Sequence, residues 1–352
     1  MHTVSPPATI LVTGANGFLG LWQVRELLNR GYRVRGSVRS ADKGERIKTL
    51  LHEKQPLVED RFEYIVVPDI TKDGAFDEAV TGVDSIIHGA SPITLWAKDP
   101  QELIAPAVGG TTAVLKSALK HGTTVRRVVI TGSVVTMMRT DAPPGVYDEN
   151  DWNDYAVREV ERLGKDASGA SKYDASKVLA ERGKSAWEFY NAQKHEVPWD
   201  LTSIGPSFVF GPLPEDPASP DEMVTTASLL WSSFFKDPKP AMRYPPCFNY
   251  VDVRDVTEAF IRALEVEAAG GERIVATARA VTWQDWLDAA RDLGLLPLLE
   301  KEDPNAPKGP LPTASNAKSQ RLLGIKYKSL QETVKDTVAD FASRGWLKHL
   351  GA

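Results

Sequence analysis

The sequence predicts an α/β protein built on a doubly wound parallel sheet, followed by a smaller and irregular C-terminal domain. Short apolar runs alternate with helical patterns up to residue 205, a glycine-rich loop separates the first run from the first helix, and prolines become frequent from residue 206 onward. Strand–helix alternation over short connections favours parallel strands with helices on both faces of one sheet.

The expected strands are short apolar segments that end at glycine, proline or polar residues. We predict strands at Thr9–Val12, Tyr32–Ser37, Phe62–Val67, Asp84–His88, Arg127–Thr131 and Leu201–Ile204. Helical periodicity fills several of the intervals and recurs later in the chain. We predict helices at Leu19–Asn29, Glu102–Lys120, Ser171–Gln193, 222–235 and Ser329–Ala342, and an amphipathic segment at Tyr250–Leu264.

A change of composition near residue 205 marks the expected boundary between the two domains. Nine prolines fall between residues 206 and 246, and this density disfavours continuous helix or strand. We therefore expect a sheet domain over residues 8–205 and a second domain over most of 206–352. Residues 247–265 are expected to return to the first domain.

Composition and charge exclude several classes of function. The chain has 352 residues and a formal charge of −5, and its basic residues are scattered, so neither nucleic acid nor a membrane is an expected partner. Its N-terminus lacks the apolar core of a signal peptide. The single cysteine, Cys247, excludes an internal disulfide and fits a cytoplasmic location. The six histidines lack paired ligand spacing, so we expect no metal site.

The glycine-rich loop TGANGFLG, residues 13–20, predicts a dinucleotide site. Gly14, Gly17 and Gly20 follow the first strand and open the first helix. Residues without Cβ allow a pyrophosphate to approach the backbone, and the helix N-terminus supplies free N–H groups. A glycine triplet alone would also fit a tight turn, but the strand before it and the helix after it favour a Rossmann-type fold.

The end of the second strand indicates NADP rather than NAD. An NAD site places Asp or Glu there for the ribose 2′-OH, but residues 33–41, RVRGSVRSA, contain no acid. Arg39 lies near the expected place and Lys43 follows; a 2′-phosphate would pair well with them. Asp69 and Ile70, after the third strand, are positioned to contact adenine, although Asp69 would equally cap the next turn.

Two Tyr–Lys pairs have the four-residue spacing that places side chains together on a helix. The first, Tyr173 and Lys177, lies in ASKYDASKVLAER near the start of its predicted helix, whereas Tyr190 and Lys194 lie much further along. Ser133 ends the fifth strand, at the sheet edge where ligands bind. We therefore predict that Ser133, Tyr173 and Lys177 form the catalytic cluster and that Tyr190 is structural.

This set of side chains fits reduction of a carbonyl group. Hydride addition to carbon leaves negative charge on the oxygen, which then needs a proton donor and a second hydrogen bond. Tyr173 is the predicted donor, and we expect the adjacent Lys177 ammonium and the cationic nicotinamide to lower its pKa from about 10. Ser133 would donate to the developing oxyanion, and Lys177 would also bind the nicotinamide ribose.

Seven segments in order identify the chain as similar to the extended short-chain dehydrogenases/reductases. They are VTGANGFLG, YRVRGSVRS, IIHGASP, VVITGS, YDASKVLAE, IGPSFVFGP and YVDVRDVTEAF. Within that superfamily the chain resembles the fungal NADPH-dependent aldehyde/ketone reductases, which are related to yeast methylglyoxal reductase and plant dihydroflavonol 4-reductase. The resemblance implies NADP(H) as cofactor, a small-molecule carbonyl substrate, and a monomer or homodimer.

The resemblance also assigns residues to the cofactor. The residues assigned to the cofactor phosphates are Gly14, Gly17, Phe18, Leu19, Gly20, Arg39 and Lys43. The residues assigned to the remainder of the cofactor are Ala90, Ser91, Tyr173, Lys177, Pro206 and Ser207. The chain departs from the common pattern at Gly132, where serine often precedes the catalytic serine, and at the additional Arg35.

The substrate is expected over the nicotinamide, between the catalytic cluster and the proline-rich segment. Candidate pocket walls are Pro92, Ile93, Val134, Phe208, Trp231 and Phe234. Apolar and aromatic walls would suit hydrophobic or aryl carbonyls. For Trp231 and Phe234, ordinary packing inside a helical core is the favoured alternative.

Three classes of function are compatible with these motifs. An NADPH-dependent carbonyl reductase fits all of them, and a hydroxysteroid dehydrogenase would differ mainly in substrate and direction. A sugar-nucleotide epimerase or dehydratase retains NAD, so Arg39 in place of an acid argues against it. A non-catalytic NADP sensor has no need of a proton donor, so intact Ser133, Tyr173 and Lys177 argue against it.

Overall fold

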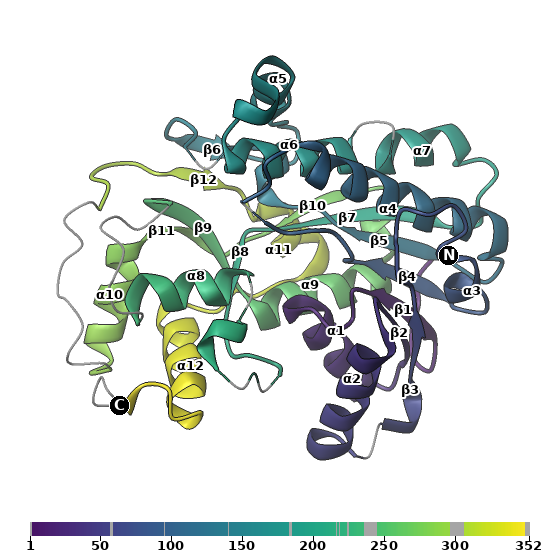
Figure 1. The fold of residues 1–352 in the computed structure, drawn as a ribbon, viewed down its shortest axis with the longest axis horizontal. Coiled ribbons are helices and arrows are strands. Elements are labelled where there is room, and N and C mark those ends of the chain that lie inside the picture. The colour runs from purple at the N-terminus through teal and green to yellow at the C-terminus, as the bar shows by residue number, and fades with distance from the viewer. Residues whose placement is uncertain are drawn as a thin grey trace.

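A computed structural model describes residues 2–56, 59–94, 96–139, 141–182, 185–215, 217, 219–223, 225–235, 245–295 and 306–348. Its main sheet has seven parallel strands in the order β10-β7-β5-β4-β1-β2-β3 (Figure 1). Their bounds are β1 Thr9–Thr13, β2 Arg33–Val38, β3 Phe62–Val66, β4 Ser85–His88, β5 Arg127–Thr131, β7 Asp200–Pro206 and β10 Arg273–Ala276. This sheet confirms the predicted fold class.

Helices cover both faces of the sheet, so successive residues of a central strand enter different cores. Ile10 and Val12 of β1 pack with one set of helices, whereas Leu11 packs with the other. On the first face lie α1 Phe18–Asn29, α2 Ala41–Lys54 and α9 Val253–Glu265. On the second face lie α3 Asp77–Val80, α4 Gln101–His121, α6 Gly169–Glu181 and α7 Ala186–Gln193 (Figure 1).

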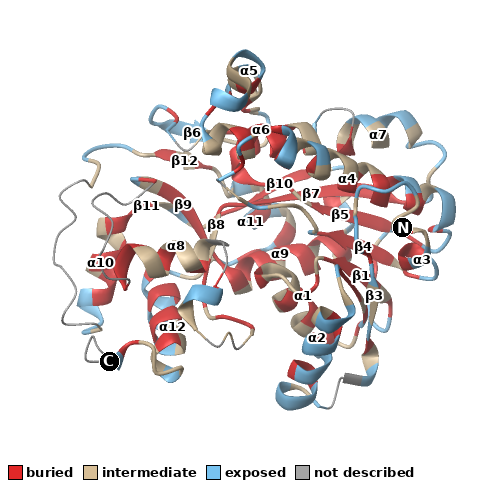
Figure 2. Cartoon of the chain, in the orientation of Figure 1, coloured by how far each residue is buried: buried red, intermediate tan, exposed pale blue. Residues whose placement is uncertain are grey.

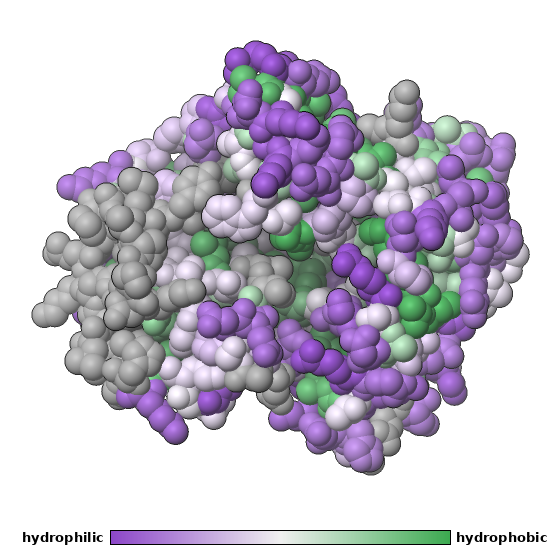
Figure 3. Space-filling model, viewed as in Figure 1, coloured by the Kyte–Doolittle hydropathy of each residue, from purple (hydrophilic) through white to green (hydrophobic). Residues whose placement is uncertain are grey.

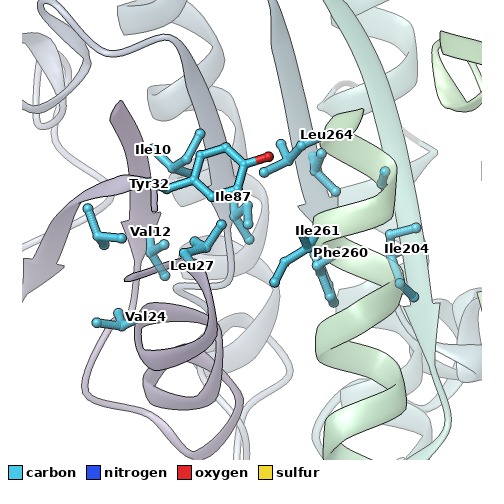
Figure 4. Packing of buried hydrophobic residues seen from close by; sticks show 14 of the residues in the cluster. Ile10, Val12, Val24, Leu27, Tyr32, Ile87, Ile204, Phe260, Ile261 and Leu264 are labelled. Atoms are coloured by element: carbon cyan, nitrogen blue, oxygen red, sulfur yellow. The ribbon is translucent and has the colours of Figure 1, made fainter. Parts of the chain in front are cut away.

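The packing of α1 against α9 closes the first face (Figure 4). Leu27 of α1 and Ile261 of α9 are fully buried in one cluster with the strands. The ring of Tyr32 lies in the same cluster, and its hydroxyl donates to the Glu265 carboxylate at 3.1 Å. Residues from both halves of the sequence therefore build the core beneath the sheet.

A second lobe contains a three-stranded sheet, β11-β9-β8, and three helices. Its elements are β8 Phe208–Phe210, α8 Thr225–Phe234, β9 Cys247–Asp252, β11 Arg279–Thr282, α10 Trp283–Asp292 and α12 Leu330–Ser343. The lobe is held by aromatic packing, as between Phe234 and Trp286, whose rings stack 4.6 Å apart. The remaining elements are β6 Gly145–Tyr147, α5 Asp154–Leu163, β12 Pro312–Ala314 and α11 Ala317–Leu323.

Residues at the centre of the molecule are buried, and those on the outer helices are more exposed (Figure 2). The central strands and α9 are largely buried, whereas the outer sides of α5 and α2 are exposed. In the described part of the chain, no helix combines the length and the apolar character that crossing a bilayer would take.

The predicted strands all occur, but two predictions about the helices need correction. The helix expected at Ser171–Gln193 is two helices, because Ser185 has a φ of −124° and a ψ of −106°, outside the helical region. The segment Tyr250–Leu264 divides between β9 and α9, with Asp252 capping the helix through the backbone N–H of Arg254. The edge strand β10 was not predicted.

A buried ion pair joins β5, β7 and the end of α9 at the amino edge of the sheet. The fully buried Arg127 donates from Nε and Nη2 to the two carboxylate oxygens of Asp200, at 2.6 and 2.8 Å. Its remaining donors reach the carbonyls of Ala263, Val266 and Glu267. A Cβ on Gly270 would lie 2.0 Å from Asp200, so the site also requires a glycine there.

We expect Arg127→Met to lower the free energy of unfolding by about 3–5 kcal/mol, because it leaves the Asp200 carboxylate buried without its partner. The neighbouring Arg126→Met is the control: Arg126 pairs with Asp84 at the surface, and its loss should cost about 1 kcal/mol or less. Chemical denaturation followed by circular dichroism measures both values. Equal losses in the two variants would contradict the role assigned to Arg127.

Candidate active site

The glycine-rich loop is a close-packed turn between β1 and α1. Gly14 has a φ of +71°, and a Cβ there would lie 3.2 Å from the Ala90 backbone. A Cβ on Gly20 would lie 2.3 Å from the Gly14 carbonyl oxygen, and the N–H of Gly17 donates to that oxygen at 2.9 Å. Larger residues at positions 14 and 20 would therefore displace the turn.

The first turn of α1 has the properties of an anion site. Gly17 caps the helix without a side-chain hydrogen bond, and no acidic residue lies in the first turn. The free N–H groups and the helix dipole favour a phosphate group there. Phe18 is buried and Leu19 is half-buried against the core, which anchors the helix start. These residues fit the pyrophosphate of a dinucleotide.

Arg39 and Lys43 lie at the end of β2 and in the first turn of α2. Arg39 is exposed and Lys43 half-buried; within the described ranges, neither side chain has a hydrogen bond or an ion pair. Arg35, by contrast, donates to Glu63 at 2.7 Å and to the Thr81 carbonyl at 2.7 Å. The additional Arg35 is therefore structural, whereas Arg39 and Lys43 are available to a 2′-phosphate.

Asp69 and Ile70 have structural contacts of their own. The Asp69 carboxylate accepts from the Thr71 N–H at 2.9 Å and from its hydroxyl at 2.7 Å. These hydrogen bonds, with a smaller contribution from nearby Arg39, lower the pKa of Asp69. Ile70 is half-buried over Gly110 of α4. Asp69 thus caps the turn, which was the alternative to contacting adenine. Its carboxylate also interacts electrostatically with Arg39.

A hydrogen-bonded Thr–His pair joins the carboxyl ends of β1 and β4. Thr13 Oγ1 lies 2.9 Å from Nδ1 of the buried His88, and it accepts from the N–H groups of Gly89 and Ala90 at 3.0 and 3.1 Å. Burial, with a contribution from the Lys177 charge, lowers the pKa of His88 to about 3. A neutral imidazole therefore supports the segment that reaches Ser91.

Ser133 follows β5 and caps the short 3₁₀ turn Val134–Thr136. Its φ of −164° and ψ of 153° are extended, and its Oγ accepts from the Val135 N–H at 3.3 Å. The side chain is 9% exposed. Its side chain also lies close enough to the Tyr173 hydroxyl to lower the pKa of that phenol. The structure therefore brings Ser133 and Tyr173 together at the carboxyl edge of the sheet.

Lys177 lies one helical turn after Tyr173 and is buried. Its Nζ donates to Ser91 Oγ at 3.0 Å and lies 5.6 Å from the centre of the Tyr173 ring. Burial lowers the pKa of Lys177 to about 8, opposed by the charge of Glu181. Tyr190, from the second pair, stacks instead on Trp199 with ring centres 5.8 Å apart.

The pKa of Tyr173 differs from our expectation. Burial raises it, as does the charge of Asp174, while the hydrogen bond from Ser133 lowers it. Burial outweighs any lowering by Lys177, because a buried phenolate is costly. Asp174 is itself buried, and desolvation raises the pKa of its carboxyl despite a hydrogen bond from Asn153.

Pro206 and Ser207 lie where β7 ends beside β10. Pro206 is opposite Ala276 in the parallel ladder, and the Ser207 N–H donates to the Ala276 carbonyl at 3.2 Å. Ser207 Oγ is buried and has no hydrogen-bond partner among the residues described. A buried hydroxyl without a partner is costly, so this one is suited to a ligand group.

The predicted pocket walls fall into two groups. Val134 is buried beside the catalytic cluster, Phe208 and Pro92 are partly exposed, and Ile93 is 58% exposed. Figure 3 shows hydrophobic residues gathered in a recess near the centre of this face, inside a hydrophilic rim. Trp231 packs on aromatic rings, and Phe234 has no exposed surface. Those two side chains form core contacts, which fits the alternative of ordinary core packing.

Three supporting residues were not predicted from the sequence: Thr13, His88 and Glu181. Thr13 and His88 end buried strands, and polar residues at two neighbouring carboxyl edges are a signal that could have identified them. Glu181 lies four residues after Lys177, on the same helix face. In the part of the chain that the structure describes, no group of three His, Cys, Asp or Glu side chains is arranged to hold a metal.

Known relatives cover nearly the whole chain. NADPH-dependent methylglyoxal reductase GRE2 of Saccharomyces cerevisiae is 32% identical over 94% of this chain and 97% of the relative. Ketoreductase azaE of Aspergillus niger is 32% identical over 94% of this chain and 96% of the relative. Dihydroflavonol 4-reductase of Arabidopsis thaliana is 30% identical over 94% of this chain and 78% of the relative.

Solved structures show the same fold. The yeast methylglyoxal/isovaleraldehyde reductase Gre2 complexed with NADPH has a TM-score of 0.81 and 30% identity, over 97% of this chain and 99% of that one. Gre2 from Candida albicans in complex with NADPH has a TM-score of 0.79. The sequence also matches the NAD dependent epimerase/dehydratase family over residues 10–276. The chain therefore belongs to this family, that of the extended short-chain dehydrogenases/reductases.

Proposed function

We propose that the chain is an NADPH-dependent carbonyl reductase that converts aldehydes or ketones to alcohols. The observation that carries this proposal is the cluster of Ser133, Tyr173 and Lys177 at the carboxyl edge of the sheet, beside a glycine loop suited to a dinucleotide. Ligands of doubly wound sheets bind at this edge. The names of the related methylglyoxal reductase and ketoreductase agree with the proposal.

We propose that residues 8–205, joined by α9 and the edge strand β10, hold NADPH; of the segment 247–265, β9 belongs to the second lobe. The phosphates of NADPH would lie on the loop of Gly14, Gly17 and Gly20, and its 2′-phosphate near Arg39 and Lys43. Beyond the phosphates, the proposed contacts are Asp69, Ile70, Ala90, Ser91, Pro206 and Ser207. When bound, the cofactor supplies the hydride.

Tyr173 is the proposed proton donor, and Ser133 orients the substrate oxygen. The raised pKa keeps the phenol protonated at neutral pH, which is the form that can donate. Ser133 lies within hydrogen-bonding reach of the phenol, so both hydroxyls can face one oxygen atom. Lys177 supplies positive charge beside the phenol and favours the phenolate that proton donation leaves behind.

The proposed substrate is a small hydrophobic or aryl carbonyl compound, bound against Pro92, Ile93, Val134 and Phe208. Most of residues 206–352 would form the substrate side of the site. Apolar walls around a few polar groups are typical of small-molecule pockets. We propose that the protein works as a monomer or homodimer in the cytoplasm, where its single cysteine would remain reduced.

Oxidation of NADPH by the purified protein tests the proposal directly. Absorbance would be followed with a panel of aryl aldehydes and ketoesters, with NADH in parallel. We expect turnover that depends on the carbonyl and prefers NADPH. Conversion of a sugar nucleotide without net cofactor oxidation would instead identify an epimerase, preference for a steroid alcohol a hydroxysteroid dehydrogenase, and NADPH binding without any turnover a sensor.

Tyr173→Phe should lower kcat by about 10²- to 10⁴-fold, because it removes the proposed proton donor. NADPH affinity, measured by fluorescence titration, should stay within about twofold. Tyr190→Phe is the matched control, since Tyr190 begins the other Tyr–Lys pair and packs on Trp199. Comparable kcat values for the two variants would refute the role of Tyr173.

Arg39→Ala should weaken NADPH binding about 10- to 100-fold and leave NADH binding nearly unchanged, because charged hydrogen bonds to a 2′-phosphate are lost. Arg33→Ala removes an equally exposed arginine from the other end of β2 and serves as the control. Isothermal titration calorimetry with each cofactor gives the four affinities needed. If Arg39→Ala weakened both cofactors equally, the 2′-phosphate would be bound elsewhere.

A further inference from the structure

A second buried ion pair lies beneath the catalytic cluster, between the last turn of α6 and the edge strand β10. Arg273 Nε lies 2.9 Å from Glu181 Oε1, and the two side chains are 8% and 3% exposed. Ser203 of β7 donates to the same Glu181 oxygen at 2.7 Å. The ring of Trp152 covers the Arg273 guanidinium, whose central carbon lies 3.6 Å from the centre of the ring. The carboxylate is therefore held in one place.

Arg273 is connected to Ser133 through a single side chain. Arg273 Nη2 donates to Thr136 Oγ1 at 2.6 Å, and Thr136 Oγ1 donates to the Ser133 carbonyl at 2.8 Å. The other guanidinium donor, Nη1, bonds the carbonyls of Glu149 and Asp151. Thr136 is fully buried. The guanidinium thus fixes the backbone that carries the catalytic serine.

Glu181 is connected to Lys177 across a small cavity. The cavity has a volume of about 20 Å³, and its lining includes Lys177, Glu181, Thr131 and Ser91. Glu181 Oε2 and Thr131 Oγ1 are buried there, and among the described residues neither has a hydrogen-bond partner. The space suffices for one water molecule. Such a water would link the Lys177 ammonium to both oxygen atoms.

Gly132, where the sequence departs from the common pattern, makes room for this arrangement. A Cβ at that position would lie 3.1 Å from Glu181 Oε2 and 2.9 Å from Ser203 Oγ. A serine there would compete with the carboxylate for the same space. The glycine and the buried glutamate are therefore complementary features of this chain.

The charges around Lys177 assign the electrostatic role to Glu181. His88 of β4 is neutral over the working pH range, because burial holds its pKa at about 3. Tyr173 of α6 is protonated, and Arg273 of β10 is paired with Glu181 itself. Glu149 uses its carboxylate to accept from the Val275 N–H. Glu181 is accordingly the anion that favours the ammonium form of Lys177.

We propose that Glu181 and Arg273 form a positioning pair for the catalytic cluster. Glu181 keeps Lys177 charged across the cavity, and Arg273 fixes Ser133 through Thr136. This inference rests on the proposed reductase function and adds two residues that need not touch substrate or cofactor. A merely structural pair would affect stability, whereas a positioning pair also sets the pH dependence of catalysis.

The test of the electrostatic part is Glu181→Gln, which keeps the shape and the acceptor but removes the charge. Loss of the anion disfavours the Lys177 ammonium, so the alkaline limb of the kcat–pH profile should move to lower pH by on the order of one pH unit. The KM for NADPH should stay within about twofold. Glu188→Gln, on the exposed side of α7, is the matched control and should leave the profile unchanged.

A direct titration of Lys177 separates this inference from the proposed function. The ¹³Cε signal of labelled lysine, assigned with Lys177→Met, reports its protonation even when no carbonyl is turned over. Its midpoint should fall in Glu181→Gln. If this single variant does not fold, Glu181→Gln with Arg273→Gln removes both charges together and should show a smaller fall in the same direction, because the nearer charge is that of Glu181. An unchanged midpoint in a folded variant overturns the electrostatic role, whether or not the wild-type protein is a reductase.

Thr136→Val tests the connection to Ser133 while leaving the ion pair intact. We expect kcat to fall about tenfold with an unchanged KM for NADPH and an unchanged pH profile, because only the position of the serine backbone is affected. Wild-type kcat in this variant would overturn the positioning role of Arg273.

Discussion

The site depends on the placement of helix α6 along the carboxyl edge of the sheet. Three buried side chains of that helix hold it at successive turns. Lys172 donates to the carbonyls of Ala97, Lys98 and Lys165; Lys177 donates to Ser91; and Glu181 bonds Arg273 and Ser203. Each partner lies far from α6 in sequence or beyond its N-terminus. Tyr173 lies between the first two anchors, so its position follows from theirs.

Burial controls the charges that the site can carry. The same desolvation that keeps His88 neutral lowers the pKa of Lys177 to about 8 and raises that of Tyr173. The resting site therefore holds a protonated phenol beside an ammonium of marginal stability. A phenol in this state can give up its proton only where positive charge compensates for the loss. This explains why a fixed carboxylate next to Lys177 would affect the chemistry and not only the stability.

Local patterns were sufficient to predict six of the seven strands of the main sheet, the glycine loop and the proximity of Ser133, Tyr173 and Lys177, because each depends on a short segment at a strand end or a helix start. The break before α7 was missed although Gly183 and Ser185, both weaker helix formers than Ala, interrupt the sequence there. The edge strand β10 was also missed, although β4 is equally short and was predicted. Glu181–Arg273 and Thr13–His88 join distant segments, and pairing at such distances is decided by tertiary packing.

Transfer of deuterium from NADPH tests the central claim most directly. The purified protein would be given an aryl aldehyde and NADPH carrying deuterium at both C4 positions of the nicotinamide, and the alcohol would be analysed by mass spectrometry. The account predicts one deuterium on the carbinol carbon of the product, and about 10²- to 10⁴-fold less labelled alcohol when Tyr173→Phe replaces the wild-type protein for the same time. Alcohol without deuterium, or no alcohol from any carbonyl although NADPH binds, would contradict it.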